Sequence, residues 1–281
     1  MPGMTRATAA QSVWRWIGII AGVVWLFIAF YPILYILLTS LRSQQGFLMG
    51  NPWLPTQTPT LSNYATVWNA GFARYFLNSV IVSVITVLLI LVCALPFAYA
   101  VVRTRRLWVQ GLFNVLLVGL ALPIQAAIIP VYILVSKFHL YDTLAGLILP
   151  GVAFGLPLTV LILVNFVRDI PKDLYEAMAI EGAGDRAVLL RLVLPLSKPA
   201  LLSVGIYNFV QSWNNFLFPL VLTQQDSVRV LPLALVNFRG QYTINVPVIM
   251  AAVTLSALPL ILAYVFGRRY LLQGMLAGFS K

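Results

Sequence analysis

A row of polar side chains runs along one otherwise apolar stretch of the sequence, from Ala200 to Leu222. Four of them recur at positions i, i+3, i+4 and i+7 and therefore share one helix face. Amide and hydroxyl groups exchange hydrogen bonds with hydroxyl groups, and nearby aromatic rings can stack on the apolar face of a sugar ring. This chemistry suits a neutral hydroxylated solute, although the same amides could equally hold helices together. The candidate path residues are Asn208, Gln211, Ser212, Trp213 and Asn215.

A second feature is a run of mixed charge that begins at Asp173. The Asp173 carboxylate could accept a backbone N–H at a helix start, and Glu176 could reach back to complete a capping box. Gly182 and Gly184 would end this helix, because glycine adopts positive φ without steric cost, and Asp185 would cap a second short helix. The sequence thus predicts a helix, a glycine turn and a helix outside the membrane. The expected apolar face comprises Leu174, Ala177 and Met178.

The spacing within this run follows a recognisable pattern: E-A-A, three residues, G, nine residues, I-x-L-P. Glu176-Ala177, Gly182 and Leu194-Pro195 match it, whereas Met178 replaces alanine and Leu192 replaces isoleucine. The run resembles the cytoplasmic loop of the membrane subunits of bacterial ATP-binding-cassette (ABC) importers. The resemblance implies a coupling helix that docks on an ATPase subunit. The docking residues it implies are Glu176, Ala177, Met178, Glu181 and Gly182.

Two further stretches are similar to the carbohydrate branch of these importers, close to the smaller permease of the maltose-type system. They are Trp213-Asn214-Asn215-Phe216 and the C-terminal run that starts at Arg268-Arg269. The resemblance implies a type I importer permease fold and transport of a sugar into the cytoplasm by alternating access. It also implies a second homologous permease subunit, two cytoplasmic ATP-binding subunits that hold ATP and Mg²⁺, and an extracellular or periplasmic solute-binding protein.

The composition defines the class of protein. Of 281 residues, 61% are hydrophobic and only 9% are charged, whereas soluble domains average about 25% charged residues. This predicts an all-α membrane protein embedded in a lipid bilayer. The net charge of +11 does not indicate a nucleic-acid partner, because the basic residues cluster at the ends of apolar runs. The single cysteine, Cys93, excludes an internal disulfide.

Six apolar runs are long enough to cross a bilayer, which takes about 20 residues. The first is too long for a signal peptide and lacks a small-residue cleavage site. We therefore expect a six-helix permease domain at 17–266 with a coupling loop at 168–198, and tails at 1–16 and 267–281. The expected spans are Ile17–Leu41, Phe76–Val102, Leu107–Val135, Leu144–Val167, Ala200–Leu222 and Val246–Phe266.

Lysine and arginine are distributed unequally between the two sides of these spans. Of the 18 basic residues, 13 lie on the side that holds both tails and the loop at 168–198. Cytoplasmic loops carry the excess of Lys and Arg. The sequence therefore predicts a multi-pass protein of the bacterial inner membrane with both termini and the coupling loop in the cytoplasm.

No Asp, Glu, Lys, Arg or His falls inside expected spans two to six. Ion-coupled carriers usually keep such a residue as a relay, and a hydrolase would need a catalytic group. No phosphate-binding G-x-x-x-x-G-K-[ST] loop is present, so we expect any ATP to be bound by another chain. We also expect no enzyme activity, no resident cofactor and no metal site in this chain. His139 is expected to be a solvated residue at a loop edge rather than a catalytic one. Arg42 and Arg74 could meet acidic groups of a binding protein. A permease for another solute, such as glycerol 3-phosphate or an amino acid, and a stand-alone carrier or channel remain alternatives.

Overall fold

The computed structural model describes residues 4–51, 53–236 and 244–279, and over these ranges it is helical with no strands. Four of the described helices are long and apolar enough to cross a membrane, or six segments if each of two bent helix pairs counts as one span. The predicted all-α membrane architecture is confirmed. The chain divides into two compact units, one formed by 1–70 and 238–255 and the other by 71–237 and 256–281.

The first unit contains one long apolar helix, two short helices and the first part of another long helix. Between Trp14 and Ser40, the most apolar 18-residue stretch of the long helix has no buried side chain. Many of its large apolar side chains are therefore available to lipid or to another chain. The helices are α1 (Met4–Ser40), α2 (Gln44–Met49), α3 (Ser62–Val67) and the first part of α14 (Val246–Phe279), with η1 (Trp68–Phe72) following α3.

Arg42 organises the loop that follows α1. Its side chain is 2% exposed, and its guanidinium donates to the carbonyl oxygen of Leu54. The Asn63 amide donates to the carbonyl oxygens of Ser40, at 2.8 Å, and of Arg42, at 2.7 Å. The hypothesis that Arg42 meets a binding protein is wrong for this structure, because its guanidinium is buried and hydrogen-bonded within the loop. Arg74 is exposed, so for Arg74 the hypothesis remains a prediction.

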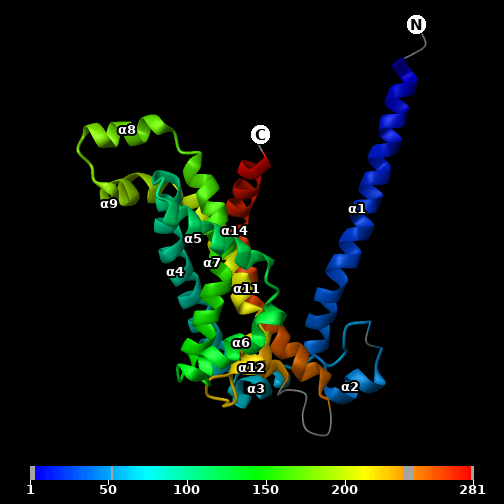
Figure 1. The fold of residues 1–281 in the computed structure, drawn as a ribbon. Helices are drawn as coiled ribbons and strands as arrows, with labels where there is room; N and C mark the ends of the chain where they lie inside the picture. The colour runs from blue at the N-terminus through cyan, green and yellow to red at the C-terminus, as the bar shows by residue number, and fades with distance from the viewer. Residues whose placement is uncertain (1–3, 52, 237–243, 280–281) are drawn as a thin grey trace. The chain divides into compact units, whose positions relative to one another are not determined.

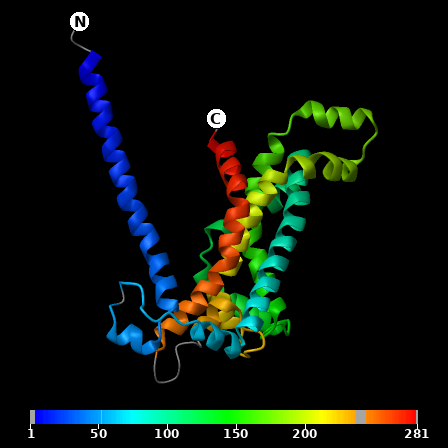
Figure 2. The same cartoon turned by 180° about the vertical axis from the view of Figure 1, so that it is seen from behind.

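The second unit is built around three helices that run side by side, α4 (Ala73–Arg103), α7 (Leu144–Arg168) and α11 (Lys198–Trp213) (Figures 1 and 2). Fully buried apolar side chains, among them Val160 and Leu163, fill the space between these helices. The unit also contains α5 (Leu107–Val118), η2 (Gly119–Ala121), α6 (Ile124–Lys137), α12 (Leu217–Leu222), α13 (Leu231–Ala234) and the rest of α14.

Two predicted spans are interrupted. The run from Leu107 to Val135 bends by 114° between η2 and α6, where Pro123 stands at the start of α6 and has no N–H to continue the preceding helix. The run from Ala200 to Leu222 stops at Trp213 and resumes at Leu217. There the Asn215 side chain accepts the backbone N–H of Phe218 at 3.2 Å, which offers the chain an alternative to helical bonding.

The predicted helix–turn–helix loop is confirmed. It consists of α8 (Lys172–Ile180), α9 (Asp185–Val188), η3 (Leu189–Val193) and α10 (Leu194–Leu196). In Figure 1 α8 and α9 form a hairpin beyond the ends of α4 and α7. At the end of the chain α14 continues to Phe279, so much of the predicted C-terminal tail has a helical backbone. The side chains of that tail, including Arg268 and Arg269, lie outside the described residues.

Candidate functional site

The turn of the α8–α9 hairpin depends on one glycine. Gly182 has φ of +73°, a conformation that side chains other than glycine rarely adopt. Its N–H donates to the Ala179 carbonyl oxygen at 3.0 Å, and the Ala183 N–H donates to that of Met178 at 3.0 Å. This pair of bonds is a Schellman motif, which satisfies the last carbonyls of α8. Gly182 therefore ends the helix as predicted, whereas Gly184 has an extended backbone with φ of −74°.

The predicted capping groups of the hairpin are wrong. Pro171 occupies the cap position of α8, and no side chain caps that end. Asp173 instead lies in the first turn, where its negative charge complements the helix dipole. Gly184 is the cap residue of α9, and the Asp185 carboxylate accepts a hydrogen bond from the Tyr99 hydroxyl at 2.9 Å. Tertiary contact with α4 thus replaces the local capping bond at Asp185.

The two faces of α8 differ from the predicted ones. Tyr175 is buried and Met178 is half-buried against the core, so this side faces inward rather than the side of Leu174 and Ala177. The opposite side is exposed, and Ile180 on it is 87% exposed. Of the expected docking residues, four are exposed and Met178 alone is partly covered. The exposed four are Glu176, Ala177, Glu181 and Gly182.

The inward side of α8 is held against the ends of α7 and α4. The Tyr175 hydroxyl donates to the Val167 carbonyl oxygen at 3.4 Å. The Arg103 guanidinium lies 4.6 Å from the centre of the Tyr175 ring, a cation–π geometry. Burial raises the pKa of the Tyr175 phenol, and the Arg103 charge acts in the opposite direction. The phenol therefore stays neutral at physiological pH.

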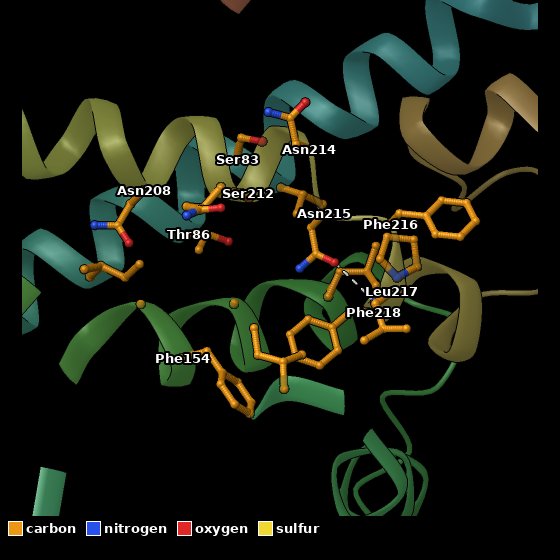
Figure 3. A pocket seen from close by; sticks show the side chains of 18 of the residues that line it. Ser83, Thr86, Phe154, Asn208, Ser212, Asn214, Asn215, Phe216, Leu217 and Phe218 are labelled. Carbon is orange, nitrogen blue, oxygen red and sulfur yellow. Dashed lines mark hydrogen bonds between the residues drawn. The ribbon is translucent and has the colours of Figure 1, made fainter. Parts of the chain in front are cut away.

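A cavity of about 560 Å³ lies among α4, α7, α11 and the segment around α12 (Figure 3). Its lining, which lies wholly within the described part of the chain, contains no Asp, Glu, Lys, Arg or His. Its polar groups are neutral amides and hydroxyls, and its other walls are apolar. The polar lining residues are Ser79, Ser83, Thr86, Gln125, Tyr207, Asn208, Gln211, Ser212, Asn214 and Asn215.

The predicted path residues have different roles in this cavity. Asn208 is 4% exposed, and its amide donates to Thr159 Oγ1 and the Val204 carbonyl oxygen, both at 2.8 Å. It therefore ties α11 to α7, and Gly155 provides the space: a Cβ there would lie 2.7 Å from Asn208 Oδ1. Asn215 lines the cavity but is occupied in part by its bond to Phe218 (Figure 3).

Gln211 and Ser212 are less committed to the fold. Gln211 is exposed, and its side-chain amide donates one hydrogen bond, to the Tyr207 hydroxyl at 2.9 Å. Ser212 is half-buried on the cavity wall. Trp213 does not join them: it is 3% exposed, lies outside the cavity lining, and donates from its indole nitrogen to the Ser256 carbonyl oxygen at 3.1 Å. The structure thus brings four of the five candidates to the cavity.

Sequence reasoning missed the polar groups that α4 contributes to the cavity beside those of α11. Ser79, Ser83 and Thr86 on α4 line the same cavity, at i, i+4 and i+7. That spacing is visible in the sequence and would have predicted a shared face. The Ser83 and Thr86 hydroxyls are buried without a hydrogen-bond partner, whereas the Ser79 hydroxyl accepts the Leu231 N–H at 2.8 Å. The cavity therefore receives neutral polar groups from α4 as well as from α11.

The side chains of the described region contain no group of three or more His, Cys, Asp or Glu that could hold a metal ion. Comparison with known proteins shows the family to which this chain is related. Residues 94–276 match the family model described as "Binding-protein-dependent transport system inner membrane component". The chain belongs to this family. The matched range includes the α8–α9 hairpin and α11.

Curated relatives extend the similarity beyond that range. The chain is 42% identical over 92% of its length to a putative ABC transporter permease protein ORF2 of Caldicellulosiruptor sp. (strain Rt8B.4), of which it covers 94%. It is 35% identical over 88% of its length to the diacetylchitobiose uptake system permease protein NgcG of Streptomyces coelicolor, of which it covers 83%. These matches identify the chain as a permease of the ABC transporter type.

A solved structure supports the fold. A bacterial ABC transporter involved in the import of the acidic polysaccharide alginate contains a chain that superposes with a TM-score of 0.84. The alignment covers 96% of this permease and 99% of that chain at 21% identity. At this identity the likeness shows the fold alone, which is that of an importer permease.

Proposed function

We propose that this permease is the membrane-spanning subunit of an ATP-driven importer that moves a neutral sugar into the cytoplasm. The observation that carries the proposal is the α8–α9 hairpin, which lies at the end of the α4–α7–α11 core and exposes an apolar side chain, Ile180, in water. Ile180 shares a face of α8 with the exposed motif residues Glu176 and Ala177, four and three positions earlier, so this face combines polar and apolar groups that a protein partner can cover. The hairpin provides the docking surface for an ATPase subunit.

Within this proposal α8 is the coupling helix. Glu176, Ala177, Glu181 and Gly182 face the ATPase, and Met178 supports the helix from behind, as its partial burial indicates. ATP and Mg²⁺ are bound by two cytoplasmic partner subunits, since this sequence contains no phosphate-binding loop. Both termini of the permease then lie in the cytoplasm, on the side of the membrane that carries the excess of Lys and Arg.

The cavity defines the solute class. Neutral amide and hydroxyl groups match the donors and acceptors of sugar hydroxyls, and Phe154 and Phe216 on its walls offer apolar surface. A phosphate ester or a carboxylate would leave a buried charge without a counter-ion, which is costly. The lining therefore favours a neutral sugar over glycerol 3-phosphate or an acidic sugar. The sugar specificity of the diacetylchitobiose relative points the same way.

The mechanism is alternating access with the sugar delivered by an extracellular binding protein, as the family description suggests. A second homologous permease completes the pathway. ATP binding closes the ATPase pair, the coupling helices follow, and the bundle opens to the binding protein. Hydrolysis returns the bundle to the inward-open state.

The test is transport by the co-purified complex in liposomes with its binding protein. A panel of neutral disaccharides and oligosaccharides, beginning with diacetylchitobiose, is offered with alginate oligosaccharides as anionic competitors. We expect uptake of a neutral sugar that requires ATP and is unaffected by the anionic competitors. Glu176→Lys should abolish that uptake while the chain remains inserted. Uptake without ATP, or uptake of the anionic sugar alone, would contradict the proposal.

A further inference from the structure

We propose that two side chains at the cytoplasmic end of α4, Tyr99 and Arg103, fasten the coupling hairpin so that the hairpin and α4 move as one body. We call these two residues, with their partners Asp185 and Tyr175, the α4 clamp. The inference rests on the proposed function, because only an importer driven through this hairpin needs to transmit its movement. It assigns a positioning role to four residues outside the docking surface and outside the cavity.

The geometry of the clamp joins both arms of the hairpin to one helix. Tyr99 and Arg103 are four residues apart and therefore lie on the same face of α4. The Tyr99 hydroxyl donates to Asp185 Oδ1 at 2.9 Å on α9. Arg103 lies over the Tyr175 ring of α8 at 4.6 Å. A helix that holds only one arm could let the hairpin open, whereas contacts to both arms hold the hairpin closed and oriented.

Burial indicates that these contacts are part of a packed region. Tyr99 and Tyr175 are 7% and 5% exposed, although α8 is otherwise mostly exposed. Val188 and Val193, on the returning arm, belong to the same apolar cluster as Leu95 of α4. The hydrogen bond to Asp185 is charge-assisted, which makes it stronger than a bond between neutral groups. Packing and bonding therefore both favour joint movement of the hairpin with α4.

The same helix carries a wall of the cavity. Thr86 lies 13 positions before Tyr99 on α4, which corresponds to about 20 Å along a helix that rises 1.5 Å per residue. A displacement of the hairpin is thus passed along α4, which stays helical from Ala73 to Arg103 with Pro96 inside it, to the row formed by Ser79, Ser83 and Thr86. The clamp gives a direct route from the ATPase docking surface to the place where the sugar passes.

The first test removes one hydroxyl. Tyr99→Phe keeps the ring in the core and deletes the bond to Asp185. We expect ATP-driven sugar uptake to fall about three- to tenfold, as for a charge-assisted bond at a partly exposed site, while ATP hydrolysis stimulated by the binding protein is retained. Tyr64→Phe is the matched control, because it deletes a phenolic hydrogen bond, to Ser40 at 2.6 Å, in the other unit. Equal effects of the two variants, or a parallel loss of hydrolysis and uptake, would overturn the proposal.

The second test restores the link by chemistry. Cys93 is the only cysteine of the chain, so a Cys93→Ser background permits a pair of new cysteines, Tyr99→Cys and Asp185→Cys. We expect this pair to lose uptake, to regain it when a bifunctional methanethiosulfonate reagent bridges the two thiols, and to lose it again on reduction. A bridge that blocks uptake would mean that the hairpin and α4 must separate during the cycle. A bridge that fails to restore uptake would also contradict the proposal, because the link between Tyr99 and Asp185 would then not be what transport needs.

Amide hydrogen exchange separates failure of the clamp from failure of the proposed function. It is measured on the same wild-type and Tyr99→Phe preparations without ATP or sugar. Faster exchange of α8 and α9 amides in Tyr99→Phe supports the fastening of the hairpin to α4 even when the complex shows no transport, and unchanged exchange contradicts it. Absence of ATP-dependent uptake by the wild-type complex contradicts the proposed function instead.

Discussion

The coupling hairpin and the cavity wall on α11 use side chains in opposite ways. On α8 the motif residues are mostly exposed, and an apolar side chain, Ile180, lies almost fully in water. On α11 the candidate polar residues line the cavity, and Asn208 is already bonded within the protein. The hairpin therefore leaves its contacts for a partner, whereas the cavity wall uses part of its polar surface to hold its own helices together. A polar residue in a span is evidence of a solute path only after its internal partners are known.

The largest effect should come from the turn of the hairpin. Gly182→Val places a β-branched side chain at φ of +73°, which costs on the order of 1–3 kcal/mol and changes the angle between α8 and α9. We expect at least a tenfold loss of ATP-dependent uptake by the reconstituted complex, with normal insertion.

Gly184→Val is the matched control for this prediction. No atom lies within 4 Å of a Cβ built at either glycine, but Gly184 has an extended backbone that valine readily adopts. Gly184→Val should retain most of the uptake. Similar losses in the two variants would show that the backbone conformation of Gly182 is not what matters.

A smaller effect is expected on the exposed side of α8. Ile180→Ser removes an apolar side chain whose burial against a partner would contribute about 1.5–3 kcal/mol. We expect the ATPase subunits to dissociate from the detergent-solubilised complex about ten- to a hundredfold more readily, measured by co-purification at graded concentrations. Ile180→Val should bind almost normally. Unchanged association in Ile180→Ser would remove Ile180 from the docking surface.

Two substitutions of polar residues on the cavity wall should have modest effects that differ in kind. Asn208→Ala deletes a bond between α11 and α7, which in membrane proteins is worth about 0.6–1.7 kcal/mol, so the thermal midpoint of the purified complex should fall. Gln211→Ala, at an exposed cavity position, should leave that midpoint unchanged and raise the KM for sugar uptake a few-fold. A reversal of these two results would assign the roles the other way round.

The sequence was sufficient for features that depend on local chemistry. Six apolar runs, the hairpin and the Gly182 stop follow from hydropathy and from glycine's tolerance of positive φ, and the structure confirms all-helical spans and the turn. The exceptions are the capping box at Asp173, where Pro171 takes the cap position, and the capping role given to Asp185, whose partner, Tyr99, is 86 residues away in the sequence. Local patterns carry no information about such a contact.

Features that depend on tertiary packing were predicted less well. The amides of α11 share a helix face as expected, but the sequence could not distinguish Asn208, tied to Thr159, from Gln211, which faces the cavity. Trp213 was assigned to the path because of its position in the sequence, whereas its indole is buried and bonded to Ser256. Pro123 indicates a kink before α6, but the sequence could not predict a bend as large as 114°, since proline permits a break without requiring one.

The most direct test of the central claim, that this permease works through a docked ATPase, is gentle-detergent purification of the tagged full chain from its native membrane, followed by mass spectrometry. The account predicts recovery of a second permease-like chain and a soluble protein with a phosphate-binding loop, and loss of the latter in the Ile180→Ser variant. Recovery of this chain alone, still able to move sugar into liposomes without ATP, would contradict it and indicate a self-contained carrier.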